Sequence, residues 1–105
     1  NNMSPSTLKI KQMALARLIK EEKLYKQELE EQQALVSQLK NDANADKYSL
    51  KTQIQILEES EKMIPAIHLK VKDHLNDLKA FLEKYDGTEP TEEAKKAIED
   101  AEKLF

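Results

Sequence analysis

The chain has 105 residues, of which 35% are charged and only 5% aromatic, with one Gly, three Pro, no Cys and a net charge of −3. So few turn-forming and aromatic residues argue against a β-rich fold, and the lack of Cys excludes disulfides and thiolate metal sites. No apolar run has the length of a membrane span or resembles a signal peptide. We therefore expect a soluble intracellular protein with one all-α domain over residues 1–105.

A first long helix is predicted over residues 5–41. The Ser-Pro-Ser segment at residues 4–6 suits a helix start, and Asn1 and Asn2, which precede the first Met, are left outside the fold. Downstream, apolar residues recur at spacings of three and four as far as Leu39. This heptad-like pattern predicts a helix that packs along a partner helix.

A turn is predicted at residues 41–46, because Asn and Asp side chains bond to nearby backbone groups. Asn44, Asp46 or Ser49 is expected to cap the helix that follows.

A second long helix is predicted over residues 46–85, and its apolar stripe continues in phase through Pro65. A proline inside a helix removes one hydrogen bond and clashes with the preceding turn, so we expect a kink near Pro65. We expect Gly87, the single glycine, to end the helix in the left-handed conformation.

A third, shorter helix is predicted over residues 90–105, capped by Thr88 or Thr91. Short loops make neighbouring helices antiparallel, so the third helix should cover residues 67–85 and the first half of helix one. Its acidic residues would then lie near the basic first twenty residues. The predicted fold is an elongated antiparallel three-helix bundle with coiled-coil-like packing.

The other half of the hairpin, residues 25–39 and 50–64, should form a two-helix arm. Such an arm cannot cover its whole apolar stripe, and the exposed part is a candidate surface for a partner or for a dimer. Glu22, Gln32 and Glu61 interrupt the predicted stripes, where polar residues can fix the register of paired helices.

Enzyme activity is not expected. With one Gly the chain cannot carry a dinucleotide-binding loop, a P-loop or a nucleophile elbow. Its carboxylates are expected on solvated helix faces, and its two histidines are not spaced as ligands on one helical face. No catalytic residue, cofactor or metal is therefore predicted. The acidic net charge, with no aromatics among the basic residues, also argues against binding nucleic acid or membranes.

Four segments resemble motifs of the tubulin-binding cofactor A family. They are Leu8–Lys11 continuing to Ala16–Glu21, Asp46–Lys51, Ile56–Pro65 and Leu75–Leu78. The third, with sequence ILEESEKMIP, is the most specific, because a proline in a helix interior is costly. Lys62 and Ala66 depart from the family pattern, which has Met and Asp there.

The resemblance implies a chaperone that binds β-tubulin folding intermediates after the cytosolic chaperonin and stabilises them without ATP. It also implies a cytoplasmic protein associated with the microtubule cytoskeleton, either monomer or homodimer, that works with other tubulin-folding cofactors. The candidate partner-binding residues are Tyr25, Lys26, Leu29, Ser60, Met63, Ile64 and Pro65.

Two other interpretations stay open. Leu29, Met63 and Ile64 could simply pack the two long helices together. The whole chain could be a structural coiled-coil module that self-associates. A prefoldin-like co-chaperone is a more distant alternative, because prefoldins need β-hairpins between their helices and the predicted turn has no strand signal.

Overall fold

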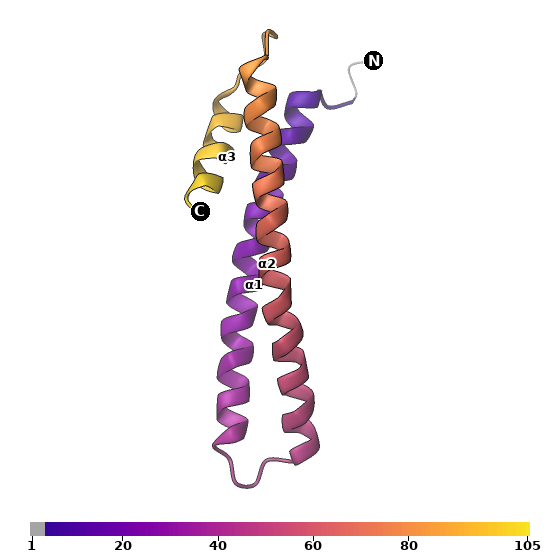
Figure 1. The fold of residues 1–105 in the computed structure, drawn as a ribbon, viewed down its shortest axis with the longest axis vertical. Coiled ribbons are helices and arrows are strands. Elements are labelled where there is room, and N and C mark those ends of the chain that lie inside the picture. Colours follow the sequence, from indigo (N-terminus) through magenta and orange to yellow (C-terminus); the bar gives the residue numbers. More distant parts are fainter. Residues whose placement is uncertain (1–3) are drawn as a thin grey trace.

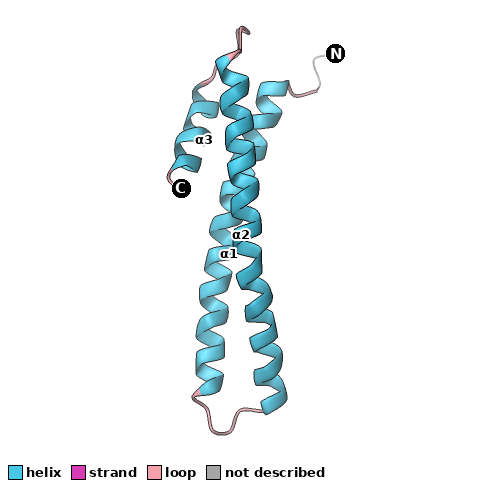
Figure 2. Ribbon diagram, viewed as in Figure 1, coloured by secondary structure: helices cyan, strands magenta, loops and turns pink. Residues whose placement is uncertain are grey.

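The computed structural model describes residues 4–105 and contains three helices (Figures 1 and 2). They are α1 (Thr7–Lys40), α2 (Lys47–Glu83) and α3 (Glu92–Glu102). The first two helices form a long antiparallel hairpin, and α3 folds back beside the half of the hairpin that holds the start of α1. The predicted all-α, elongated three-helix bundle is confirmed.

The molecule is a rod. Its principal extents are 64 × 30 × 17 Å and its radius of gyration is 19.4 Å. A compact domain of this length would have a radius of gyration of about 13 Å. The long hairpin sets this shape, because a 37-residue helix such as α2 spans roughly 55 Å at 1.5 Å per residue.

The helix ends follow local capping chemistry. Ser6 Oγ accepts a hydrogen bond from the backbone N–H of Lys9 at 3.1 Å. Of the three residues predicted as possible caps of α2, Asp46 is the one that caps it, and its carboxylate accepts a hydrogen bond from the backbone N–H of Ser49 at 3.0 Å. Thr91 occupies the cap position of α3 but makes no side-chain cap hydrogen bond. The observed ends lie within three residues of the predicted ones, and Asn1 and Asn2 lie outside the described residues.

The three-helix half holds the core. Leu15, Val71 and Leu78 are fully buried there, and α3 contributes only alanines to the buried set. Small side chains let the backbone of α3 approach the hairpin closely. The buried members of this core are Leu8, Leu15, Leu18, Ile67, Val71, Leu75, Leu78, Ala94, Ala97 and Ala101. The predicted position of the third helix is therefore confirmed.

The remaining half is a thin two-helix arm, defined as residues 25–39 and 50–64. Within this fully described arm, Val36 is the single buried hydrophobic residue. Gln32 ties the two helices together, because its Nε2 donates to the carbonyl and side-chain oxygens of Gln53, both at 2.9 Å. The arm therefore buries little apolar surface compared with the three-helix half.

Pro65 lies inside α2, which continues as one helix on both sides of it. The proline side chain is exposed. The helix does not end there, and a kink near Pro65 stays a prediction.

The prediction that Gly87 ends the second helix in the left-handed conformation was wrong. No described glycine has a positive φ, and α2 already ends at Glu83, four residues earlier. The helix closes with tight backbone bonds, such as the one from the N–H of Tyr85 to the carbonyl of Leu82 at 3.2 Å. A Cβ at position 87 would overlap the Tyr85 ring and hydroxyl, so a larger residue there would require the Tyr85 side chain to move.

The acidic residues of α3 lie near the start of α1 as expected, because Glu92 and Glu93 line one hollow with Lys9, but the basic residues of α1 form their ion pairs elsewhere. Lys11 instead pairs with Asp77 of α2 at 2.6 Å, and Arg17 approaches Glu21 of its own helix at 3.8 Å. Among residues 4–105, none of the ion pairs joins a basic residue of α1 to α3. Ion pairs with α1 therefore do not hold α3, which packs on the hairpin through its alanines and pairs Glu102 with Lys79 of α2 at 3.4 Å.

For one of the three polar residues predicted to lie in the apolar stripes, the prediction was wrong. Glu22 is buried and Gln32 half-buried, as expected, but Glu61 is exposed. Burying a carboxylate is costly unless cations or donors satisfy it. Glu22 has such partners and Glu61 has none within reach in the described chain, so α2 turns Glu61 to solvent.

Candidate protein-interaction surface

The antiparallel hairpin brings Tyr25 of α1 and Met63 of α2 to the same hollow, where the arm joins the three-helix half. The hollow has a volume of about 150 Å³ and is lined by Glu21, Tyr25, Met63, Ala66, Ile67 and Lys70. Met63 is 44% exposed, which is high for a large apolar side chain. Ala66, one of the departures from the family pattern, places a small side chain inside this hollow.

The other predicted contact residues are divided among different environments. Leu29, Ser60 and Ile64 are half-buried, as residues between two packed helices are, whereas Pro65 is exposed on α2. Lys26 directs its ammonium to Glu22 at 2.8 Å. The structure thus brings Tyr25 and Met63 together, and it does not gather all seven candidates on one face.

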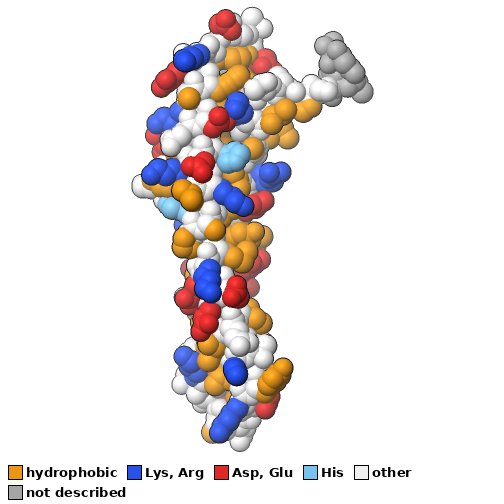
Figure 3. Space-filling model, turned by 45° about the vertical axis from the view of Figure 1, so that its right-hand side comes forward, with side chains coloured by type: hydrophobic (Ala, Val, Ile, Leu, Met, Phe, Trp, Pro, Cys, Tyr) orange, Lys and Arg blue, Asp and Glu red, His pale blue; other side chains and the backbone are white. Residues whose placement is uncertain are grey.

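Further apolar side chains are exposed on and beside the arm. They are Leu24 (50% exposed), Leu35 (39%), Tyr48 (77%) and Ile56 (43%). Figure 3 shows apolar side chains distributed along the rod between charged groups of both signs. None of these four residues is among the contact candidates named from the sequence. These exposed apolar side chains are further candidates for contact with a partner.

A buried carboxylate lies at the point where three helices become two. The side chain of Glu22 is 1% exposed and accepts a hydrogen bond from Lys26 Nζ at 2.8 Å. Its other oxygen lies 2.9 Å from His68 Nδ1. The His68 ring in turn stacks on Phe105, with centroids 4.1 Å apart and planes 29° from parallel. This cluster therefore connects both long helices to the segment that follows α3.

Burial raises the pKa of the Glu22 carboxyl, but hydrogen bonds and positive charge from Lys26 and His68 act more strongly in the opposite direction. The pKa of Glu22 is therefore held below its ordinary value of 4.5. Sequence reasoning placed Glu22 and His68 on the two stripes without pairing them. Their pairing depends on the register of the hairpin, which the structure shows in both Lys11–Asp77 and Glu22–His68.

Glu22→Gln is expected to lower the free energy of unfolding by about 1–2 kcal/mol at neutral pH, because it removes the charge that accepts hydrogen bonds from Lys26 and His68, two partly solvated side chains. A carboxyl whose pKa is depressed by folding stabilises the protein above its unfolded pKa, and this contribution is lost as pH falls through the folded pKa. The difference between wild type and variant should therefore shrink below about pH 4.5. Urea denaturation across pH measures it, and a difference independent of pH would contradict the assignment.

Within residues 4–105, no helix is long and apolar enough to cross a membrane. No group of three or more His, Cys, Asp and Glu residues is arranged to hold a metal ion in that range.

Comparison with known proteins identifies the family. The model of the family described as "Tubulin binding cofactor A" matches residues 3–100. The chain belongs to the tubulin binding cofactor A family. The resemblance of its four sequence motifs is thereby confirmed over nearly the whole length of the chain.

Relatives from distant organisms support this membership. Tubulin-specific chaperone A of Saccharomyces cerevisiae is 42% identical over 103 residues, which cover 98% of this chain and 97% of the relative. Tubulin-folding cofactor A of Arabidopsis thaliana is 39% identical, over 93% of this chain and 90% of the relative.

Solved structures of the tubulin binding cofactor A family have the same fold. RBL2P, described as a β-tubulin binding post-chaperonin cofactor, matches with a TM-score of 0.86 and 41% identity, over 94% of this chain and 97% of its own. Tubulin folding cofactor A from Arabidopsis thaliana matches with a TM-score of 0.79 and 39% identity, over 91% and 92%.

Proposed function

We propose that this chain binds β-tubulin and stabilises its folding intermediates after they leave the cytosolic chaperonin. The observation that carries the proposal is the near-complete match to RBL2P, a β-tubulin binding post-chaperonin cofactor, with a TM-score of 0.86 over 94% of the chain. Two relatives from other organisms with tubulin-specific or tubulin-folding names support it.

The shape of the molecule suits this task. A thin arm with exposed apolar residues can cover an apolar surface on a client that would otherwise aggregate. The chain itself stays in solution because 35% of its residues are charged. Binding of this kind is driven by buried apolar area, and no step of it requires nucleotide hydrolysis.

We place the centre of the contact at Tyr25 of α1 and Met63 of α2, whose side chains line one hollow. Aromatic residues and Met are enriched in the buried centres of protein interfaces. The remaining candidates, Lys26, Leu29, Ser60, Ile64 and Pro65, would flank this centre. We further propose that the protein acts in the cytoplasm, in association with the microtubule cytoskeleton and with other tubulin-folding cofactors.

Size-exclusion chromatography with light scattering tests the proposed function. The purified chain would be mixed with β-tubulin released from chaperonin, and the mass of each species measured. We expect a defined complex of this chain with β-tubulin that lacks α-tubulin. A chain that does not bind β-tubulin and elutes as a stable self-associated rod would instead support the alternative that it is a structural coiled-coil module.

A further inference from the structure

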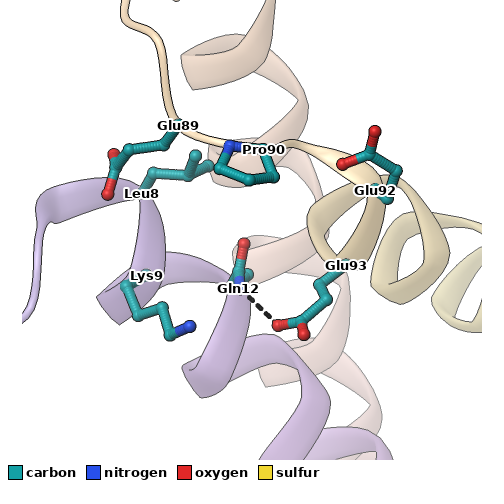
Figure 4. A pocket seen from close by; sticks show the side chains of 7 residues that line it. All are labelled: Leu8, Lys9, Gln12, Glu89, Pro90, Glu92 and Glu93. Carbon is teal, nitrogen blue, oxygen red and sulfur yellow. Dashed lines mark hydrogen bonds between the residues drawn. The ribbon is translucent and has the colours of Figure 1, made fainter.

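A second hollow lies at the other end of the hairpin from the α1–α2 turn, between the start of α1 and the start of α3 (Figure 4). Its volume is about 300 Å³. The residues that line it are Leu8, Lys9, Gln12, Glu89, Pro90, Glu92 and Glu93. None of the contacts proposed for β-tubulin lies in this hollow.

The floor of the hollow is a buried amide. Gln12 is 6% exposed, and its Nε2 donates a hydrogen bond to Glu93 Oε2 at 2.9 Å. Its Oε1 is buried and has no hydrogen-bond partner in the described chain. In Figure 4 this oxygen points away from Glu93, towards the space beneath Pro90. Most buried polar groups in proteins are hydrogen-bonded, so such an oxygen calls for a donor.

The orientation of the amide is fixed by chemistry. An ionised carboxylate only accepts hydrogen bonds, so the amide nitrogen of Gln12, rather than its oxygen, must face Glu93. The unsatisfied group is therefore an acceptor. Glu93 also keeps its second carboxylate oxygen without a hydrogen bond to any described residue, and the two acceptors belong to neighbouring side chains.

The charge of the hollow favours a cation. Three carboxylates line it against the single ammonium of Lys9. The positive end of the α3 dipole opposes a cation, but it amounts to only about half an elementary charge, and Glu92 and Glu93 in the first turn outweigh it. Glu89 is held in place by Tyr85, whose hydroxyl donates to its carboxylate and accepts its backbone N–H, both at 3.1 Å.

The geometry points to a binding site for the guanidinium group of an arginine side chain presented by a protein partner. A guanidinium has five N–H donors in a planar fork. Its donors match the unsatisfied Gln12 Oε1 and the free oxygen of Glu93, and Leu8 and Pro90 offer an apolar wall for the methylene stem. The site is independent of the proposed β-tubulin contact, and it would stand if that contact were disproved.

The probe for the test is N-acetyl-arginine-N-methylamide, titrated into the isotope-labelled chain and followed by NMR. We expect saturable shifts of the Gln12 side-chain amide and of the first backbone amides of α3. Removing a hydrogen bond to a charged group should weaken binding at least tenfold. Both Gln12→Met, which keeps the length of the side chain, and Glu93→Gln should therefore show at least this loss.

Glu99→Gln is the matched control, because it removes the same charge from the exposed face of α3 outside the hollow. This variant should bind the arginine probe as wild type does. The lysine analogue should bind more weakly, and the norleucine analogue should produce no saturable shift. The proposal is overturned if the arginine probe gives no saturable shift in the wild type, if the lysine analogue binds equally well, or if Glu93→Gln binds like Glu99→Gln. Because none of these titrations contains tubulin, the result does not depend on the proposed function.

Discussion

Leu15→Ala is expected to lower the free energy of unfolding by about 3 kcal/mol, within the range of 2–5 kcal/mol usual for truncating a buried leucine. Leu15 is 0% exposed and belongs to the core shared by all three helices. Its loss leaves a cavity where the surrounding helices can relax only in part. Urea denaturation followed by far-UV circular dichroism measures the change.

Leu24→Ala is the matched control for this prediction. The same atoms are removed from the same helix, but Leu24 is 50% exposed. A surface truncation of this kind should change the free energy of unfolding by less than about 0.5 kcal/mol. Equal losses in the two variants would mean that the burial of Leu15 is not what stabilises the fold.

The double change Tyr25→Ala with Met63→Ala is expected to weaken β-tubulin binding at least tenfold. Together the two side chains line the hollow at the head of the arm, and truncating a central aromatic residue of an interface typically costs about 2 kcal/mol or more. Met63 is exposed, whereas Tyr25 is half-buried and packs against the core, so far-UV circular dichroism must first show that the variant is folded. Competition with a labelled wild-type chain for β-tubulin measures the affinity.

The control pair is Ile10→Ala with Met13→Ala. These residues are 55% and 56% exposed on α1, in the three-helix half. Both are exposed apolar side chains, so their removal tests whether position matters or only exposed apolar area. Unchanged β-tubulin binding in the Tyr25 and Met63 variant, or an equal loss in the control, would remove the hollow from the proposed contact.

Much of the fold could be predicted from periodicity. The heptad-like spacing of Leu15 and Leu18, and of Val71, Leu75 and Leu78, identified the faces that the structure buries. Short loops then required antiparallel neighbours. Periodicity predicts which helix faces are buried but not the backbone conformation at single residues, so the left-handed conformation expected at Gly87 was wrong.

The candidate surface was harder to predict, because a stripe of residues does not say which side chains meet. Tyr25 and Met63 were both named from the family resemblance, but their shared hollow depends on the register of the hairpin. The Glu22–His68 pair likewise needs the register of two helices and the position of Phe105. The orphaned oxygen of Gln12 depends on where α3 begins, and no local pattern in α1 signals it.

The most direct test of the central claim, that the exposed arm holds β-tubulin, is hydrogen exchange of the chain alone and in complex with β-tubulin. Amides in the free arm should exchange faster than those around Leu15 and Val71, because the arm buries little apolar surface. In the complex, exchange should slow in the segments that surround Tyr25 and Met63. A complex in which the exchange of both arm segments is the same as in the free chain would contradict the account.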